Sequence, residues 1–137
     1  MNNYSDIKQL IPQQPPFVMV GKVVDATAMS CTTCLTIKAD NVLVEDGRLS
    51  AAGLLENVAQ SCATWQSIKQ LQTEERPRVG VIGSIRNCSI SLLPKVGETI
   101  TTYITTVADT GNMQVIHAQI KLNNKIIVET DMTIALN

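Results

Sequence analysis

The sequence of 137 residues is poor in aromatic side chains, which make up 3% of it, and it contains a single histidine, His117. Its net charge is −1, and it has no cluster of arginines or lysines interleaved with aromatic residues. Proteins that bind nucleic acid need such clusters to neutralise phosphate charge, so we expect no nucleic-acid partner. Structural zinc sites need several Cys and His ligands, and this chain has a single histidine. We therefore expect no bound metal, and we expect no cofactor.

Long apolar runs are also missing, since no segment approaches the roughly 20 apolar residues that a membrane-spanning helix needs. The first residues, MNNYSDIKQL, lack the basic flank and apolar stretch of a signal peptide. We therefore expect no membrane span and a cytoplasmic location. Apolar residues make up 45% of the chain and charged residues 17%, a composition that predicts one globular domain over residues 1–137.

The four cysteines include a Cys-x-x-Cys pair, Cys31 and Cys34. This pair lies in the run CTTCLTI, whose β-branched residues predict a strand. Residues three apart on a strand point to opposite faces, so the two thiols are predicted neither to form a disulfide nor to share a metal. We interpret all four cysteines, which include Cys62 and Cys88, as small structural side chains.

Six segments have the composition or alternation of strands, and turn signals separate them. They are residues 17–28, 31–39, 79–93, 98–109, 113–122 and 125–136. Residues 39–50 are predicted to form an irregular connection with a turn at Glu45–Gly47. A short amphipathic turn is predicted to begin at Ser5 and to end at Pro12. His117 alternates with apolar neighbours, which predicts an ordinary residue on the polar face of the sheet.

The segment from about Ser50 to Gln72 predicts one long helix, ended by the run TEERPR with Pro77 as the breaker. Its apolar residues recur every three or four positions, and they are Leu54, Leu55, Val58, Ala59, Cys62, Trp65 and Ile68. Glu56 falls on the shoulder of this stripe, in a shelf of small residues made by Ala52, Ala59 and Ala63. One long helix among about six largely antiparallel strands predicts an α+β fold in which the sheet wraps the helix.

Three phrases of the sequence resemble the 3-hydroxyacyl-[acyl-carrier-protein] dehydratases, in the same order and over nearly the whole chain. Residues 11–24, IPQQPPFVMVGKVV, resemble the opening LPHRxPFLLVDRV of that family. Residues 54–60, LLENVAQ, resemble its helical LxExMAQ, and residues 83–100 resemble its GxxxxxFxxxVxPGDxL segment. The variant most similar is that of the predicted dehydratases of aryl-polyene pigment clusters, in which Asp-Gly-Arg precedes the helix, as residues 46–48 do here.

This resemblance implies a hot-dog fold, in which a curved antiparallel sheet wraps a central helix and two copies form a double hot-dog dimer. It also implies an acyl tunnel at the subunit interface and a thioester partner, carried by acyl-carrier protein or coenzyme A. The assembly implied is a homodimer or a heteromer with a paralogous dehydratase, acting in fatty-acid or polyene biosynthesis.

In that family a histidine removes the α-proton of the substrate, and a carboxylate on the helix protonates the departing hydroxyl. The matching motif assigns the catalytic carboxylate to Glu56. It assigns Gln60 to the glutamine that orients this carboxylate. The positions that the resemblance implies for substrate binding are Gln13, Pro16, Phe17, Gln60 and Gly83.

The family histidine has no counterpart in this sequence. Residues 41–53, NVLVEDGRLSAAG, contain none, and the histidine of the LPHR phrase is replaced by Gln13. An amide accepts no proton at neutral pH, and losing a general base typically lowers the rate about 10²- to 10⁴-fold. Three hypotheses follow: a dehydratase that takes its base from another subunit, a non-catalytic subunit that binds carrier protein or completes an active paralogue, and a thioesterase that uses Glu56 as nucleophile or base.

Overall fold

The computed structural model describes residues 7–73 and 80–136. In chain order its elements are η1 (Ile7–Gln9), β1 (Lys22–Ala26), β2 (Ser30–Thr36), β3 (Val44–Glu45), β4 (Arg48–Leu49), α1 (Ala51–Thr73), β5 (Gly80–Ile90), β6 (Thr99–Asp109), β7 (Met113–Leu122) and β8 (Lys125–Leu136). Among these elements, no helix is long and apolar enough to cross a membrane. The predicted cap at Ser5 and the predicted helix breaker Pro77 lie outside the described residues.

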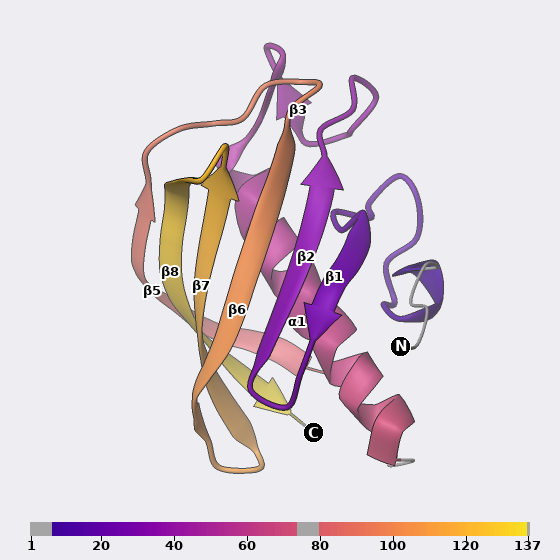
Figure 1. Cartoon of the computed structure of the whole chain (residues 1–137), viewed down its shortest axis with the longest axis vertical. Helices are drawn as coiled ribbons and strands as arrows, with labels where there is room; N and C mark the ends of the chain where they lie inside the picture. Colours follow the sequence, from indigo (N-terminus) through magenta and orange to yellow (C-terminus); the bar gives the residue numbers. More distant parts are fainter. Residues whose placement is uncertain (1–6, 74–79, 137) are drawn as a thin grey trace.

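Six of the strands form one antiparallel sheet in the order β1-β2-β6-β7-β8-β5, so β1 and β5 are its edges. Figure 1 shows the sheet curving around α1, which runs obliquely across one face of it. The predicted α+β arrangement, a sheet of six strands wrapped around one long helix, is confirmed. The helix begins where predicted, because the Ser50 hydroxyl accepts a hydrogen bond of 3.2 Å from the Gly53 backbone and caps the first turn.

Two segments differ from the prediction. The first strand begins at Lys22 rather than at Phe17, and residues 17–21 run as an extended segment along α1. Residues 44–49 form a two-stranded hairpin, β3–β4, where an irregular connection was expected. The predicted turn is the tip of this hairpin, and its Asp46 and Gly47 have φ values of 53° and 75°, as a two-residue hairpin turn requires.

The core lies between α1 and the concave face of the sheet and is built almost entirely from aliphatic side chains. The apolar stripe of α1 is buried at Leu54, Val58 and Trp65. The predicted alternation on β7 is confirmed, because Ile116 and Ala118 are buried against the helix while His117 lies on the opposite face. Cys31 is buried and Cys34 is half-buried, as their opposite faces on β2 require.

Polar side chains cross this core and join α1 to the sheet. The Asn57 side chain, which is fully buried, donates a hydrogen bond of 2.6 Å to the Met19 carbonyl and accepts one of 2.5 Å from the Thr102 hydroxyl. One turn later the hydroxyls of Ser61 and Thr33 lie 2.8 Å apart. Buried hydrogen bonds of this kind fix one register of helix on sheet, since any shift leaves polar groups without partners.

We expect the substitution Asn57→Ala to lower the free energy of unfolding by about 2–4 kcal/mol, because it leaves the Met19 carbonyl and the Thr102 hydroxyl unpaired in the core. Urea denaturation followed by circular dichroism measures the loss. Asn112→Ala, at an exposed position, is the matched control and is expected to change stability by no more than about 0.5 kcal/mol. Equal losses of stability in the two variants would contradict the stabilising role given to the Asn57 hydrogen bonds.

Candidate functional site

The Glu56 carboxylate and the Gln60 amide lie one turn apart on α1 and contact each other directly. Gln60 Nε2 donates a hydrogen bond of 2.9 Å to Glu56 Oε1 and another of 2.9 Å to the Phe17 carbonyl. Gln60 Oε1 accepts a bond of 2.6 Å from the Met19 backbone N–H. Because a backbone N–H can only donate, the orientation of the amide is fixed, and its N–H group must face Glu56.

Glu56 lines a cavity of about 290 Å³ between α1, the N-terminal segment and the strands β5 and β8. The residues that line this Glu56 cavity are Leu10, Pro12, Gln13, Glu56, Ala59, Cys62, Ala63, Gln66, Ser67, Gly80, Ile82, Gln114, Ile134 and Leu136. Two of the predicted site residues, Gln13 and Glu56, are therefore brought together although they lie far apart in the sequence. The predicted shelf of small residues, Ala59 and Ala63, forms part of the wall.

Some residues that line the Glu56 cavity carry hydrogen-bond acceptors that have no donor. The side-chain oxygens Oε1 of Gln13 and Gln66 are buried, and no group in the described part of the chain donates a hydrogen bond to either. Glu56 Oε2 likewise has no donor among the described residues, because the bond from Gln60 goes to Oε1. Unpaired buried acceptors carry a free-energy cost that a ligand relieves by donating hydrogen bonds. The Glu56 cavity is therefore suited to a ligand with a hydroxyl or an amide N–H.

The thiol of Cys62 also lines the Glu56 cavity, but it is held in its neutral form. Burial raises its pKa to about 12, and the nearby Cys31 thiol adds to the shift. A thiol is nucleophilic only as its thiolate, so at neutral pH Cys62 acts as an apolar wall residue. This agrees with the structural role predicted for the cysteines.

The other predicted site residues lie outside the Glu56 cavity. Gln60 holds Glu56 from behind rather than lining the cavity, Pro16 lines a separate cavity next to β1 and β2, and Phe17 is 61% exposed. Gly83 lies on β5 and lines neither cavity. The prediction missed Gln66, because ten residues at about 100° each place it about 80° around α1 from Glu56, and helical periodicity alone gave no signal for it.

His117 is not part of the Glu56 cavity, but it is more than an ordinary surface residue. Its Nδ1 lies 2.7 Å from Asp131 and its Nε2 lies 3.1 Å from Glu129, so both ring nitrogens face carboxylates, an arrangement that favours the doubly protonated imidazolium. The hydrogen bond to Asp131 is the largest cause of a raised His117 pKa. Asn87 and Gln119 hold the two carboxylates and lower their pKa values. Alternation predicted the face of His117 correctly, but not these partners.

One long helix inside a six-stranded antiparallel sheet is the architecture of the hot-dog proteins, and comparison with solved structures confirms this fold. The chain is similar to the dehydratase heterocomplex ApeI:P from Xenorhabdus doucetiae, with a TM-score of 0.90, 16% identity and coverage of 98% of this chain and 93% of that one. It is also similar to a hypothetical thioesterase with coenzyme A from Streptococcus pneumoniae TIGR4, with a TM-score of 0.64, 12% identity and coverage of 85% and 84%. A third similar structure is smu.793 from Streptococcus mutans UA159 bound to acetyl CoA, with a TM-score of 0.67, 12% identity and coverage of 84% and 86%.

The sequence itself identifies the family. A model of the ApeP-like family, described as ApeP dehydratase, matches residues 5–136. The chain therefore belongs to the ApeP-like family, and the predicted resemblance to dehydratases is confirmed. A search of curated proteins gives no significant match.

We expect the ion pairs of His117 to stabilise the fold most between about pH 5 and pH 6.5. The raised pKa of His117 means that its contribution is complete below the unfolded value of 6.5 and is lost as the pH rises through the folded value. The lowered pKa values of Asp131 and Glu129 mean that the contribution is also lost in acid. The difference in melting temperature between the wild type and His117→Gln should therefore shrink from pH 6 to pH 8.5.

The control for this measurement is Lys121→Gln, which removes a charge on the same sheet face without touching a carboxylate partner; Lys121 lies over the Tyr103 ring. Its melting-temperature difference should stay constant over the same pH range. If the melting-temperature difference of His117→Gln also stays constant, the imidazolium contributes nothing to stability.

Proposed function

We propose that the Glu56 cavity binds a 3-hydroxyacyl thioester and that the chain works in dehydration together with a subunit that supplies the base. The observation that carries this proposal is the Glu56–Gln60 pair in a cavity where Gln13 takes the place of the family histidine. The single histidine of the chain lies on the opposite face of the sheet. Membership of the ApeP-like dehydratase family supports the same reaction class.

Elimination of water from a 3-hydroxyacyl thioester needs a proton for the departing hydroxyl and a base for the α-proton. Glu56 would supply the first. Because Gln60 donates to Oε1, a proton carried by Glu56 sits on Oε2, the oxygen left for the substrate. Gln13 and Gln66 offer acceptors to the hydroxyl or to the amides of a pantetheine arm. Neither amide is a base, so the second role falls to another subunit.

The position of the Glu56 cavity supports such an assembly. Gly80 and Ile82 in its wall belong to β5, an edge strand that pairs with β8 alone among the described strands. Val81 and Ile85 on the same strand are large apolar residues that are 63% and 41% exposed. An unpaired, apolar edge of this length favours pairing with another strand. A copy of this chain, or a paralogue as in the ApeI:P heterocomplex, would then lie against the Glu56 cavity.

An assay with a 3-hydroxyacyl carrier-protein thioester, in which enoyl product and free thiol are both monitored, tests the proposal. We expect the purified chain alone to form little enoyl product, and a mixture with a dehydratase paralogue to form it readily. In the mixture, Glu56→Gln should lower the rate about 10²- to 10⁴-fold, because the amide cannot donate the proton.

Three outcomes would decide between the hypotheses. Rapid dehydration by the chain alone would contradict the need for a partner's base. An active mixture in which Glu56→Gln has no effect would make the chain a non-catalytic subunit. Release of free thiol by the chain alone, abolished in Glu56→Gln, would make it a thioesterase.

We expect Val81→Lys to weaken self-association or association with a paralogue by about tenfold or more, because a lysine on an edge strand opposes strand pairing. Sedimentation velocity at several concentrations measures the change. Val107→Lys is the matched control: Val107 is also 63% exposed but lies on the inner strand β6. Loss of association in both variants, or in neither, would contradict an interface at β5.

A further inference from the structure

The side chain of Gln66 lines the Glu56 cavity, and the dehydration chemistry leaves open which part of a ligand it contacts. Its Oε1 is buried without a hydrogen-bond donor, and its amide forms no hydrogen bond within residues 7–73 and 80–136. A buried acceptor without a donor is unfavourable. Because no neighbour in the described chain holds this amide, it can turn toward a ligand in the cavity. Gln66 is therefore available for ligand binding.

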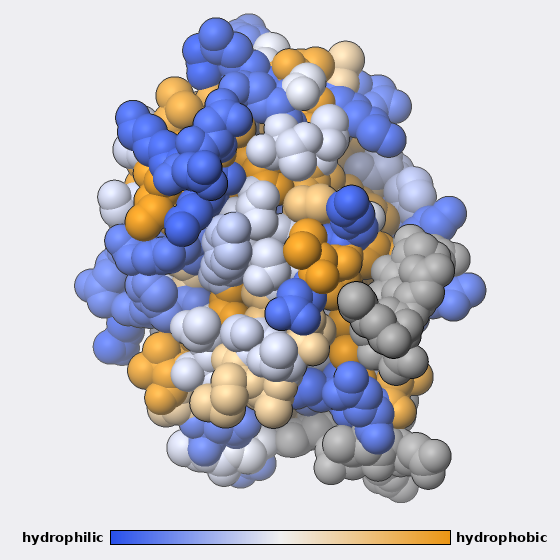
Figure 2. Space-filling view, viewed as in Figure 1, coloured by the Kyte–Doolittle hydropathy of each residue, from blue (hydrophilic) through white to orange (hydrophobic). Residues whose placement is uncertain are grey.

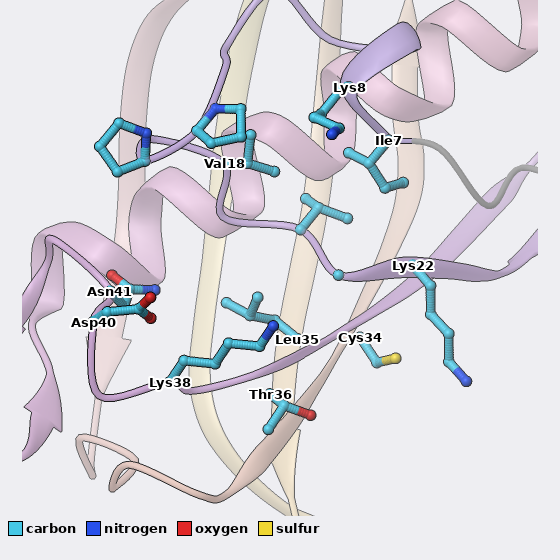
Figure 3. A pocket seen from close by; sticks show the side chains of 14 residues that line it. Ile7, Lys8, Val18, Lys22, Cys34, Leu35, Thr36, Lys38, Asp40 and Asn41 are labelled. Carbon is cyan, nitrogen blue, oxygen red and sulfur yellow. The ribbon is translucent and has the colours of Figure 1, made fainter.

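Other surfaces of the described chain make no comparable demand for a donor. Another cavity, of about 640 Å³, lies beside β1 and β2, and its described lining residues include no buried side-chain oxygen that lacks a donor. The Thr36 hydroxyl in its wall is paired with the hydroxyl of Thr99. Figure 3 shows Lys8 and Lys38 on opposite sides of this cavity. On the visible face of the molecule, Figure 2 shows hydrophilic residues exposed to solvent, where water pairs their polar groups.

Gln66 lies far along α1 from Glu56. Ten residues of helix separate the two, which is roughly 15 Å along the axis and about 80° around it. The helix residues between them that line the cavity have small side chains, namely Ala59, Cys62 and Ala63. Because these side chains are short, they leave room for a thin, extended chain. The Glu56 cavity therefore suits a ligand that carries polar groups at both ends of such a chain.

A thioester on a pantetheine arm carries two amides at fixed distances from its 3-hydroxyl carbon. The first amide nitrogen is six bonds from that carbon and the second is ten, and an extended chain advances roughly 1.2 Å per bond, so they lie roughly 7 Å and 12 Å away. A hydrogen bond adds about 3 Å. The second amide therefore spans the separation of Glu56 and Gln66, and the first amide falls short of it.

On the basis of the proposed function, in which the 3-hydroxyl lies at Glu56, we propose that Gln66 determines specificity for the pantetheine arm by accepting a hydrogen bond from its second amide N–H. The arm then lies along the small side chains between these two residues. An apolar acyl tail in the same place would leave the Gln66 oxygen unpaired, so the tail is placed on the other side of Glu56. The unpaired oxygen of Gln13 remains for the 3-hydroxyl or the first amide.

Calorimetric titration of the purified chain with two analogues tests the proposal. They are 3-hydroxybutanoyl-pantetheine and 3-hydroxybutanoyl-N-acetylcysteamine, each with a methylene in place of the thioester sulfur so that neither is hydrolysed. Both carry the same short acyl group and the first amide, but only the pantetheine analogue carries the second amide. We expect Gln66→Leu to weaken binding of the pantetheine analogue about tenfold and binding of the other analogue less than about twofold.

The matched control is Gln9→Leu, at an exposed glutamine outside both cavities, which should change neither affinity by more than about twofold. Circular dichroism checks that both variants are folded. Equal weakening of the two analogues in Gln66→Leu would mean that Gln66 contacts the acyl group or the first amide, and would overturn the proposal. An unchanged affinity for the pantetheine analogue, or failure of the wild type to bind it, would overturn it as well.

Dehydration is measured separately, with the thioesters of the same two arms in a mixture with a dehydratase paralogue. If neither thioester yields enoyl product but Gln66→Leu still weakens only the pantetheine analogue, the proposed dehydration fails and the role of Gln66 stands. If both thioesters yield enoyl product and Gln66→Leu lowers kcat/KM equally for both, the dehydration stands and the role of Gln66 is overturned.

Discussion

The Gln60 side chain is the interaction on which both the local fold and the candidate site depend. Its side-chain oxygen accepts a hydrogen bond from the Met19 N–H, and its two N–H groups donate hydrogen bonds to the Phe17 carbonyl and to Glu56. With Asn57, which bonds the Met19 carbonyl, it satisfies backbone groups that a neighbouring strand would otherwise pair. Residues 17–19 are thereby held against α1 instead of pairing in the sheet. The same amide selects the orientation of the carboxylate, so positioning of Glu56 follows from the folding of residues 17–19.

The edge of the sheet and the chemistry of the Glu56 cavity place related demands on a partner. Backbone groups along the outer side of β5 have no strand beside them among the described residues, and the dehydration proposed for the Glu56 cavity needs a base from elsewhere. Both needs arise at one place, because the cavity wall includes Ile82 of that strand. Under the proposed function, one neighbouring subunit pairs the edge and brings the histidine. Residues of β5 are exposed on both faces of the strand, as expected for an element completed by association.

The sequence predicted most of the fold because its patterns are local. The helix and the strands β6, β7 and β8 agree closely with the predicted bounds, since their alternation or helical periodicity is uninterrupted. The predicted start of β1 was wrong because the Met19 N–H bonds to Gln60 rather than to a neighbouring strand. Gln60 lies 41 residues from Met19, and no local pattern reveals this contact. The carboxylates around His117 depend on the register of β7 against β8, in which His117 faces Asp131. Alternation fixes a face of the sheet but not this register.

Under the proposed function, a glutamine at Gln13, where the family resemblance implies a histidine, alters one property of the cavity and keeps another. An amide oxygen still accepts a hydrogen bond, but it takes up no proton at neutral pH. The buried oxygens of Gln13 and Gln66 therefore keep the demand for a ligand that donates hydrogen bonds, while the capacity to remove an α-proton is gone. Binding and proton abstraction are thus separable in this chain. Under the proposed function, a subunit that retains the carboxylate and its orienting amide but not the base works together with another subunit that supplies the base.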